Sequence, residues 1–323
     1  FYVYKVINHE GHVCRGIIAA ASIEEYENNI IKKHEDTLVE KEKLFKEYMH
    51  TSGFNPEPVL LTYPDNESLE KLLLEIMESR AEYEFTTTYR DTHYVWNINN
   101  PELIQAISEE FEKMESLYIA DGHHRTASAY ELYKAKKAEN PNHKGDEVYN
   151  YFMAYLIPES DLRIYEFNRL VKDLNGLNKE EFLIKLDAVF RIENKGLEFY
   201  KPQAKNEFSM YLEGRYYSLA LRQNMYTVQN AKDALDAKIL YKTILGPILG
   251  IKDLRNDRRL SYMHGRNDKA YIQSLIDQGE YKVYFGLKPV DANEVKAIAD
   301  ANLTMPPKTT YIEPKLRNGI TIY

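Results

Sequence analysis

The chain has 323 residues, of which 44% are hydrophobic and 28% charged, as in soluble globular proteins with two or three subdomains. Its net charge of -8 disfavours general nucleic-acid binding, because phosphate backbones attract basic surfaces. No apolar run reaches about 20 residues, which disfavours a membrane span. The single cysteine, Cys14, cannot form an internal disulfide and favours a reducing compartment. We therefore expect a cytoplasmic protein with no membrane partner, and we leave a homodimer open.

The first 35 residues predict a hairpin followed by a short helix. Residues 1–8 and 13–20 read as paired strands with Gly11 in the turn. Ser22, with a glutamate three residues later, predicts a capped helix that ends near residues 33–35. The chain begins without an initiator methionine, so we expect it to be a fragment of a longer polypeptide.

A second, more charged helix is predicted next. Thr37 and Glu40 have the spacing of a capping box at its start. Helical periodicity then predicts that Leu44, Phe45 and Tyr48 face inward.

The rest of the chain mixes strands and helices, which predicts an α/β or α+β fold with mixed sheets and flanking helices. In chain order we expect a strand at 59–63, a helix at 67–80, a hairpin over 83–98, a helix from Pro101, a strand at 117–120, a helix from 126 to about 139 and a strand at 149–157. A strand from 161, a helix near 179–189, a hairpin over 208–221 and a helical region from 232 follow.

The segment LYIADGHHRTASAYELY, residues 117–133, places five polar residues where the predicted strand becomes a helix. The free N–H groups of a first helical turn, with the helix dipole, favour an anion. Glycine permits close backbone approach, and arginine can grip a phosphate through two hydrogen bonds. An aspartate can hold magnesium or orient a histidine. The pattern predicts a phosphate cradle made by Asp121, Gly122, His123, His124, Arg125 and Thr126.

Four segments carry a family resemblance: YIADGHHRTASAY, MPPKTTYIEPKLRNG, LGPILGIKDLRND and IIKKHEDT. Together they resemble a bacterial family of uncharacterised proteins, domain of unknown function 1015 (DUF1015). Family members carry a further N-terminal segment, so the chain resembles a truncated member.

The Asp-Gly-His-His-Arg signature is in turn similar to that of the ParB/sulfiredoxin-like superfamily, which includes free-serine kinases. The resemblance implies a ParB/sulfiredoxin-like core over residues 1–160, an α+β subdomain with a hairpin over 161–231, and a segment over 232–323 that completes the fold. It also implies that residues 121–125 bind the phosphates of ATP or ADP, with Mg²⁺.

A second group of polar residues lies at Lys33, His34 and Glu35. Read alone, they fit a solvated helix end. Beside a phosphate cradle, Glu35 could act as a general base while Lys33 and His34 balance phosphate charge. The family pattern has basic and acidic residues shortly afterwards, where this chain has Leu38, Leu44 and Phe45. This departure indicates a different substrate or an altered site.

Two further basic residues are candidates for phosphate binding. Arg266 follows a glycine that could let its turn close over an anion, and Lys308 is presented by a stiff run of two prolines. For Arg266 a structural loop is the favoured interpretation, and for Lys308 a stiff proline turn that anchors the last strand accounts for the pattern nearly as well.

These residues favour a nucleotide-dependent phosphotransferase (kinase) that acts on a small hydroxyl compound such as a free amino acid. In this hypothesis Glu35, Asp121 and His123 are catalytic, and Asp121 binds the metal. One alternative is a nucleotide-binding regulatory module without turnover. The other is a metallohydrolase that uses His123, His124, Asp121 and His34.

Overall fold

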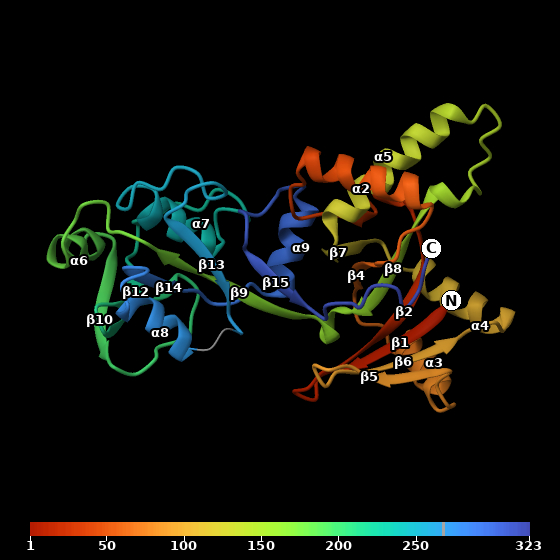
Figure 1. Cartoon of the computed structure of the whole chain (residues 1–323), viewed down its shortest axis with the longest axis horizontal. Coiled ribbons are helices and arrows are strands. Elements are labelled where there is room, and N and C mark those ends of the chain that lie inside the picture. The colour runs from red at the N-terminus through yellow and green to blue at the C-terminus, as the bar shows by residue number, and fades with distance from the viewer. Residues whose placement is uncertain (267–268) are drawn as a thin grey trace. The chain divides into compact units, whose positions relative to one another are not determined.

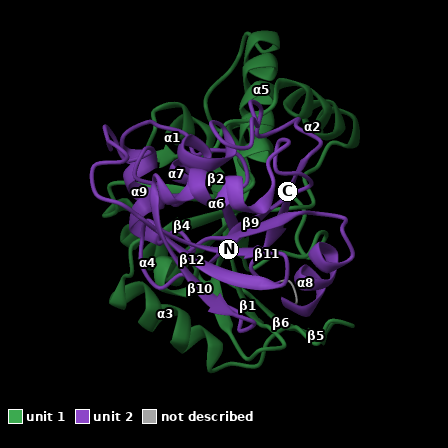
Figure 2. Ribbon diagram, turned by 90° about the vertical axis from the view of Figure 1, so that its left-hand side faces the viewer, with its two compact units in different colours: residues 1–163, 312–323 green, residues 164–311 purple. Residues whose placement is uncertain are grey.

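A computed structural model describes residues 1–266 and 269–323 of the chain. Its contacts divide the chain into two compact units, residues 1–163 with 312–323, and residues 164–311 (Figure 2). Each unit contains a sheet with flanking helices, so the predicted α/β class is confirmed (Figure 1). The expected boundaries after residues 160 and 231 stay predictions.

The sheet of the first unit is mixed. Among the described residues it has eight strands in the order β3-β7-β4-β8-β2-β1-β6-β5. The pairs β3–β7 and β4–β8 are parallel, and the other neighbouring strands are antiparallel. The strands are β1 Tyr2–Ile7, β2 Val13–Ser22, β3 Ile31–Lys32, β4 Val59–Tyr63, β5 Tyr83–Thr86, β6 Thr92–Asn97, β7 Leu117–Asp121 and β8 Tyr151–Pro158.

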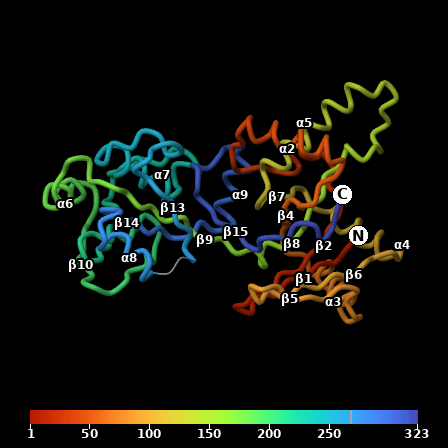
Figure 3. Tube along the Cα trace, in the orientation of Figure 1, coloured from red at the N-terminus to blue at the C-terminus, as the bar shows by residue number. Residues whose placement is uncertain are grey.

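Helices and a hydrophobic core complete this unit. The core includes Leu61 and Ile119 from the central strands, packed with Leu73 and Ile107 from two helices. Both chain termini, which are marked N and C in Figure 3, belong to this unit. The helices are α1 Ile23–Glu27, α2 Val39–Ser52, α3 Glu67–Met77, α4 Pro101–Glu112 and α5 His123–Glu139.

The first predicted helix is shorter than expected. Ser22 caps it as predicted and accepts hydrogen bonds from the N–H groups of the second and third residues that follow. The helix ends at Glu27 and not near residues 33–35, because Asn29 takes a positive φ of 59°. Ile31–Lys32 then forms β3.

The start of the second helix also differs from the prediction. The helix begins at Val39, and its N-cap Leu38 makes no side-chain capping bond. The hydroxyl of Thr37 instead donates to the carboxylate of Glu42. The predicted capping box is therefore wrong, because the N-cap is Leu38, one residue later, and its side chain has no oxygen to accept from the first-turn N–H groups.

The expected inward face of α2 is solvent-exposed. Leu44 is 65% exposed, and Phe45 and Tyr48 are exposed as well. Periodicity identified an apolar stripe but not whether another element covers it. The stripe instead borders a surface cavity described below.

The second unit holds another sheet, in the order β10-β12-β11-β14-β9-β13, with β15 beside β9. Its strands are β9 Arg163–Val171, β10 Phe190–Gly196, β11 Glu207–Leu212, β12 Arg215–Leu221, β13 Leu260–His264, β14 Val283–Gly286 and β15 Thr310–Glu313. Its helices are α6 Lys179–Asp187, α7 Asp236–Leu240, α8 Lys269–Asp277 and α9 Ala292–Asp300. A core that includes Phe182, Phe190, Phe208 and Phe285 lies against the sheet.

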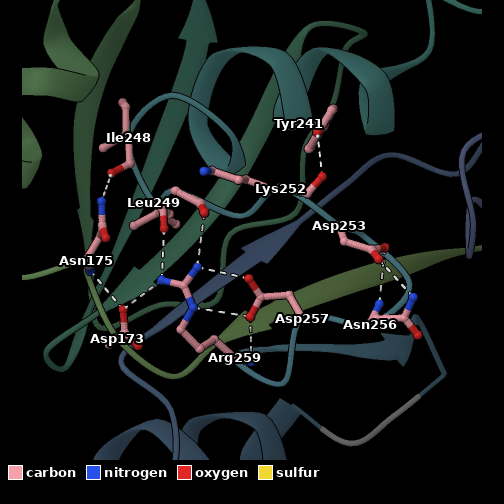
Figure 4. A network of polar contacts seen from close by, with 11 residues as sticks. Asp173, Asn175, Tyr241, Ile248, Leu249, Lys252, Asp253, Asn256, Asp257 and Arg259 are labelled. Atoms are coloured by element: carbon pink, nitrogen blue, oxygen red, sulfur yellow. Dashed lines mark hydrogen bonds and ion pairs between the residues drawn. The ribbon is translucent and has the colours of Figure 1, made fainter.

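Arg259 fixes the loop before β13 (Figure 4). Its Nε and Nη2 donate to the two carboxylate oxygens of Asp257 at 3.2 and 2.9 Å. Its Nη1 donates to the Leu249 carbonyl at 3.1 Å and to Asp173 at 3.4 Å, and its Nη2 also reaches the Gly250 carbonyl. The hydrogen-bond donors of Arg259, the last residue of the charged stretch KDLRNDRR, are therefore used by acceptors of the same chain.

Within the described part of the chain, no helix combines the length and the apolar character that a membrane crossing requires.

Candidate functional site

Two parallel strands end side by side in the first unit. β3 pairs in parallel with β7, with Ile31 opposite Leu117 and Lys32 opposite Tyr118. Because parallel strands leave a sheet at the same edge, residues 33–35 and 121–123 emerge together. The structure thus brings together the two groups of residues that the sequence singled out.

Gly122 forms the start of α5. Its φ of 103° is a conformation that side-chain-bearing residues rarely adopt. An added Cβ would lie 3.1 Å from the guanidinium carbon of Arg125. Thr126 is buried and donates both its N–H and its hydroxyl to the Gly122 carbonyl, at 3.0 and 3.2 Å. Among the described residues no side chain caps this helix, and an anion is the alternative partner that an uncapped helix start favours.

His123 is the first residue of α5 and is buried, with 4% of its surface exposed. Its Nε2 accepts the backbone N–H of His34 at 3.4 Å, so this hydrogen bond assigns the proton to Nδ1. Nδ1 lies 3.5 Å from Oε2 of Glu35, whose side chain is 38% exposed. Burial, reinforced by neighbouring basic groups, lowers the pKa of His123 well below its usual value. A neutral His123 therefore directs an N–H group at a solvent-accessible carboxylate.

His34 is also buried, and its ring meets that of His123 edge-on with 4.5 Å between centroids. Burial lowers the pKa of His34 to about 4, although the charge of Asp121 and a hydrogen bond with the Ile119 backbone act in the opposite direction. Near neutral pH the ring carries no charge. Its expected role in balancing phosphate charge stays a prediction, which this burial disfavours.

Asp121 lies between two cations. Its Oδ2 accepts from Arg125 Nη2 at 2.8 Å, and its Oδ1 accepts from Lys315 Nζ at 2.7 Å. Arg125 also forms an ion pair with Glu57 at 3.2 Å and donates to the Pro58 carbonyl. Arg125 would have to exchange one of these partners in order to grip a phosphate.

The remaining predicted residues of the first unit lie around this centre. His124 Nε2 accepts the N–H of Leu38 at 3.1 Å and so anchors the segment that leads into α2. Lys33 is exposed, with its Nζ 5.5 Å from the centre of the Tyr26 ring. A cavity of about 180 Å³ borders the site, lined by residues that include Phe45, Tyr48, Glu57 and Arg125.

Arg266 and Lys308 lie in the second unit. The Arg266 guanidinium is 5.6 Å from the Tyr165 ring, and the Lys308 Nζ is 5.2 Å from the Phe167 ring. The ring of Tyr311 contacts both aromatic residues. The two basic residues thus share one aromatic cluster, and their role in phosphate binding stays a prediction.

Lys315 and Glu57 are site residues that the sequence analysis did not single out. Lys315 stands 194 residues after Asp121, and Glu57 precedes β4, the strand that pairs with β7. The sequence pointed to Lys315 only indirectly, because Lys315 lies in the segment MPPKTTYIEPKLRNG that contributes to the family resemblance.

Across the described residues, no group of three or more histidine, cysteine, aspartate and glutamate side chains is arranged to hold a metal ion. The metallohydrolase alternative therefore gains no support from the geometry. Magnesium usually takes only one or two protein carboxylates and completes its shell with water and phosphate oxygens. Asp121 fits that role once one of its two basic partners moves away.

The chain belongs to the DUF1015 family. The family model, described as a protein of unknown function, matches residues 1–238. Comparison with curated proteins gives no match.

Among solved structures, SbnI with a C-terminal truncation from Staphylococcus aureus is 11% identical, with a TM-score of 0.46 and coverage of 92% of this chain and 82% of that one. A free serine kinase mutant in complex with AMP is 13% identical, with a TM-score of 0.43 and coverage of 92% and 87%. A conserved hypothetical protein from Pyrococcus furiosus is 13% identical, with a TM-score of 0.40 and coverage of 92% and 90%. Similarities of this size assign neither an activity nor a ligand to this chain.

Proposed function

We propose that the protein is a nucleotide-dependent phosphotransferase that uses ATP or ADP to phosphorylate a small hydroxyl compound such as a free amino acid. The observation that carries the proposal is the uncapped start of α5 beside the accessible carboxylate of Glu35, which His123 holds. An anion site and a base within one sheet edge are what phosphoryl transfer to a hydroxyl requires.

The N–H groups of residues 123–125 hold the phosphates, with Lys33 and Arg125 as further donors. Glu35 accepts the proton of the acceptor hydroxyl as the oxygen attacks phosphorus. A new phosphorus–oxygen bond forms, and the bond to the leaving nucleotide breaks. Mg²⁺ held by Asp121 would neutralise charge on the phosphates. His123, neutral and buried, keeps Glu35 in place through its Nδ1–H.

The test combines turnover with binding. Wild-type protein, Glu35→Gln and the exposed control Glu40→Gln are assayed for product with ATP or ADP and a panel of hydroxyl amino acids. Nucleotide binding is measured in parallel by calorimetry. We expect Glu35→Gln to lower kcat by about 10²–10⁴-fold with nearly unchanged nucleotide binding, because a general base contributes that much. Unchanged turnover in Glu35→Gln would contradict the assignment of the base.

A regulatory module that binds nucleotide without turnover is the second candidate. It is favoured by Asp121, whose two carboxylate oxygens already accept from Arg125 and Lys315. In that case ADP binds, no acceptor in the panel is phosphorylated, and Glu35→Gln has no effect on binding.

A further inference from the structure

A cavity of about 450 Å³ lies at the β5–β6 end of the strand order in the first unit, and β3 is at the other end. Its volume is within the roughly 300–1,000 Å³ range of small-molecule sites. The β5–β6 hairpin with its turn and the C-terminal segment form its walls. The lining residues are Tyr83, Phe85, Thr87, Thr88, Val95, Arg317, Asn318, Gly319 and Ile320.

The charge of this lining is one-sided. Arg317 is its one cation, and the lining residues, all within the described part of the chain, include no aspartate or glutamate. The Arg317 guanidinium lies 5.1 Å from the centre of the Tyr89 ring. No carboxylate among the described residues forms an ion pair with it. A guanidinium of this kind can bind a carboxylate through two parallel hydrogen bonds.

An aromatic stack supports the wall formed by Phe85. The Phe85 ring stacks on His93 with 4.9 Å between centroids, and His93 stacks on Tyr4 at 5.9 Å. The Tyr4 hydroxyl and His93 Nδ1 are 2.6 Å apart, which fixes the imidazole. His93 is 2% exposed, and its Nε2 has no hydrogen-bond partner among the described residues. Burying an unsatisfied polar atom costs stability.

The C-terminal wall is also held in place. The N–H of Gly319 donates to the Pro56 carbonyl at 2.8 Å, and Lys315, two residues before Arg317, binds Asp121. Arg317 is therefore presented from a segment fixed on both sides.

We propose that this cavity is a binding site for a small aromatic carboxylate. The carboxylate binds Arg317, and the ring packs against Tyr83 and Phe85. The hydroxyls of Thr87 and Thr88 offer additional hydrogen bonds. The site is additional to the proposed phosphotransferase site and does not depend on it.

Three probes of similar size test the proposal: benzoate, benzyl alcohol and benzylamine, each titrated calorimetrically into the whole protein. Benzoate binds saturably, the alcohol binds at least about tenfold more weakly, and the amine does not bind, because only the anion satisfies Arg317. Arg317→Gln weakens benzoate binding by about tenfold or more, whereas the exposed control Arg80→Gln does not change it. Thermal melting checks that both variants fold.

A second readout keeps the proposal falsifiable if Arg317→Gln does not fold. In wild-type protein, the methyl resonances of Val95 and Ile320 shift on addition of benzoate, whereas those of Ile31, beside the Asp121 site, do not. Absence of saturable benzoate binding, equal binding of benzylamine, or shifts at Ile31 without shifts at Val95 each overturn the proposal. Undiminished binding to folded Arg317→Gln does the same.

Discussion

Arg259 in the second unit and Arg125 in the first are both held by acidic side chains and carbonyl groups, but their surroundings differ. Arg259 meets Asp257 through two hydrogen bonds, and its remaining donors reach loop carbonyls and Asp173 (Figure 4). Arg125 is also paired, yet it lies beside the uncapped first turn of α5.

This difference separates an arginine that stabilises a loop from an arginine that lies beside a proposed ligand site. The donors around Arg259 are used by its own chain, so its network stabilises a loop. Arg125 lies beside a helix start that no side chain among the described residues caps, and a buried neutral histidine supports a carboxylate nearby. The proposed ligand site therefore differs from the Arg259 network in its uncapped helix start and in the accessible carboxylate of Glu35, and not in the presence of arginine and aspartate.

The largest expected effect is acid destabilisation through the buried histidines of the Arg125 region. The pKa of His34 is about 4 in the folded protein and about 6.5 when unfolded. Between these values the unfolded chain binds more protons, so this stability is complete above about pH 6.5 and falls as the pH drops towards 4. The loss is about 3 kcal/mol from His34, and His123 acts in the same direction.

Denaturant unfolding at several pH values measures this effect. His34→Gln should flatten the slope of the unfolding free energy between pH 6.5 and 4. An unaltered slope in His34→Gln would contradict the buried neutral state.

Arg259→Gln should cost the next largest amount. The substitution removes charge-assisted hydrogen bonds to Asp257 from a partly exposed network, and we expect a loss of about 1–3 kcal/mol of unfolding free energy. ADP affinity, measured by calorimetry, should not change. The neighbouring exposed Arg258→Gln serves as the control. A loss of ADP affinity in folded Arg259→Gln would contradict the conclusion that Arg259, unlike Arg125, has only a structural role.

Gly122→Ala should affect stability less and binding more. The φ of 103° and the close approach to the Arg125 guanidinium predict a cost of about 1–2 kcal/mol. Because the strain falls on the N–H groups that we propose hold phosphate, ADP binding should weaken by about tenfold or more. Gly145→Ala, at another positive φ with open space around its Cβ position, is the matched control for backbone strain. Equal ADP affinity in Gly122→Ala and wild type would remove α5 from the phosphate site.

The sequence was sufficient to predict most elements of the first unit and the strand-to-helix position of Gly122, because these features depend on local periodicity and on turn chemistry. Such features need no knowledge of distant parts of the chain.

Features that depend on distant contacts escaped prediction. β3 has two residues and exists because β7 lies beside it. The exposure of Leu44 depends on whether another element packs over that face of α2, which no local pattern encodes. Lys315 reaches Asp121 across 194 residues, and a single sequence contains no signal for that pairing.

Lys315→Gln should have the smallest effect on the free energy of unfolding, and it tests directly whether Asp121 binds Mg²⁺. The Lys315 side chain is 46% exposed, so the ion pair contributes less than about 1 kcal/mol to stability. Lys315 competes with any cation for the Asp121 carboxylate. Its removal should therefore lower the Mg²⁺ concentration that gives half-maximal ADP binding, by about two- to fivefold. Lys315→Arg, which keeps the charge, should leave that concentration near the wild-type value. Equal Mg²⁺ dependence in Lys315→Gln and Lys315→Arg would mean that Asp121 does not bind the metal, and the carboxylate would then serve only to hold Arg125 beside the helix start.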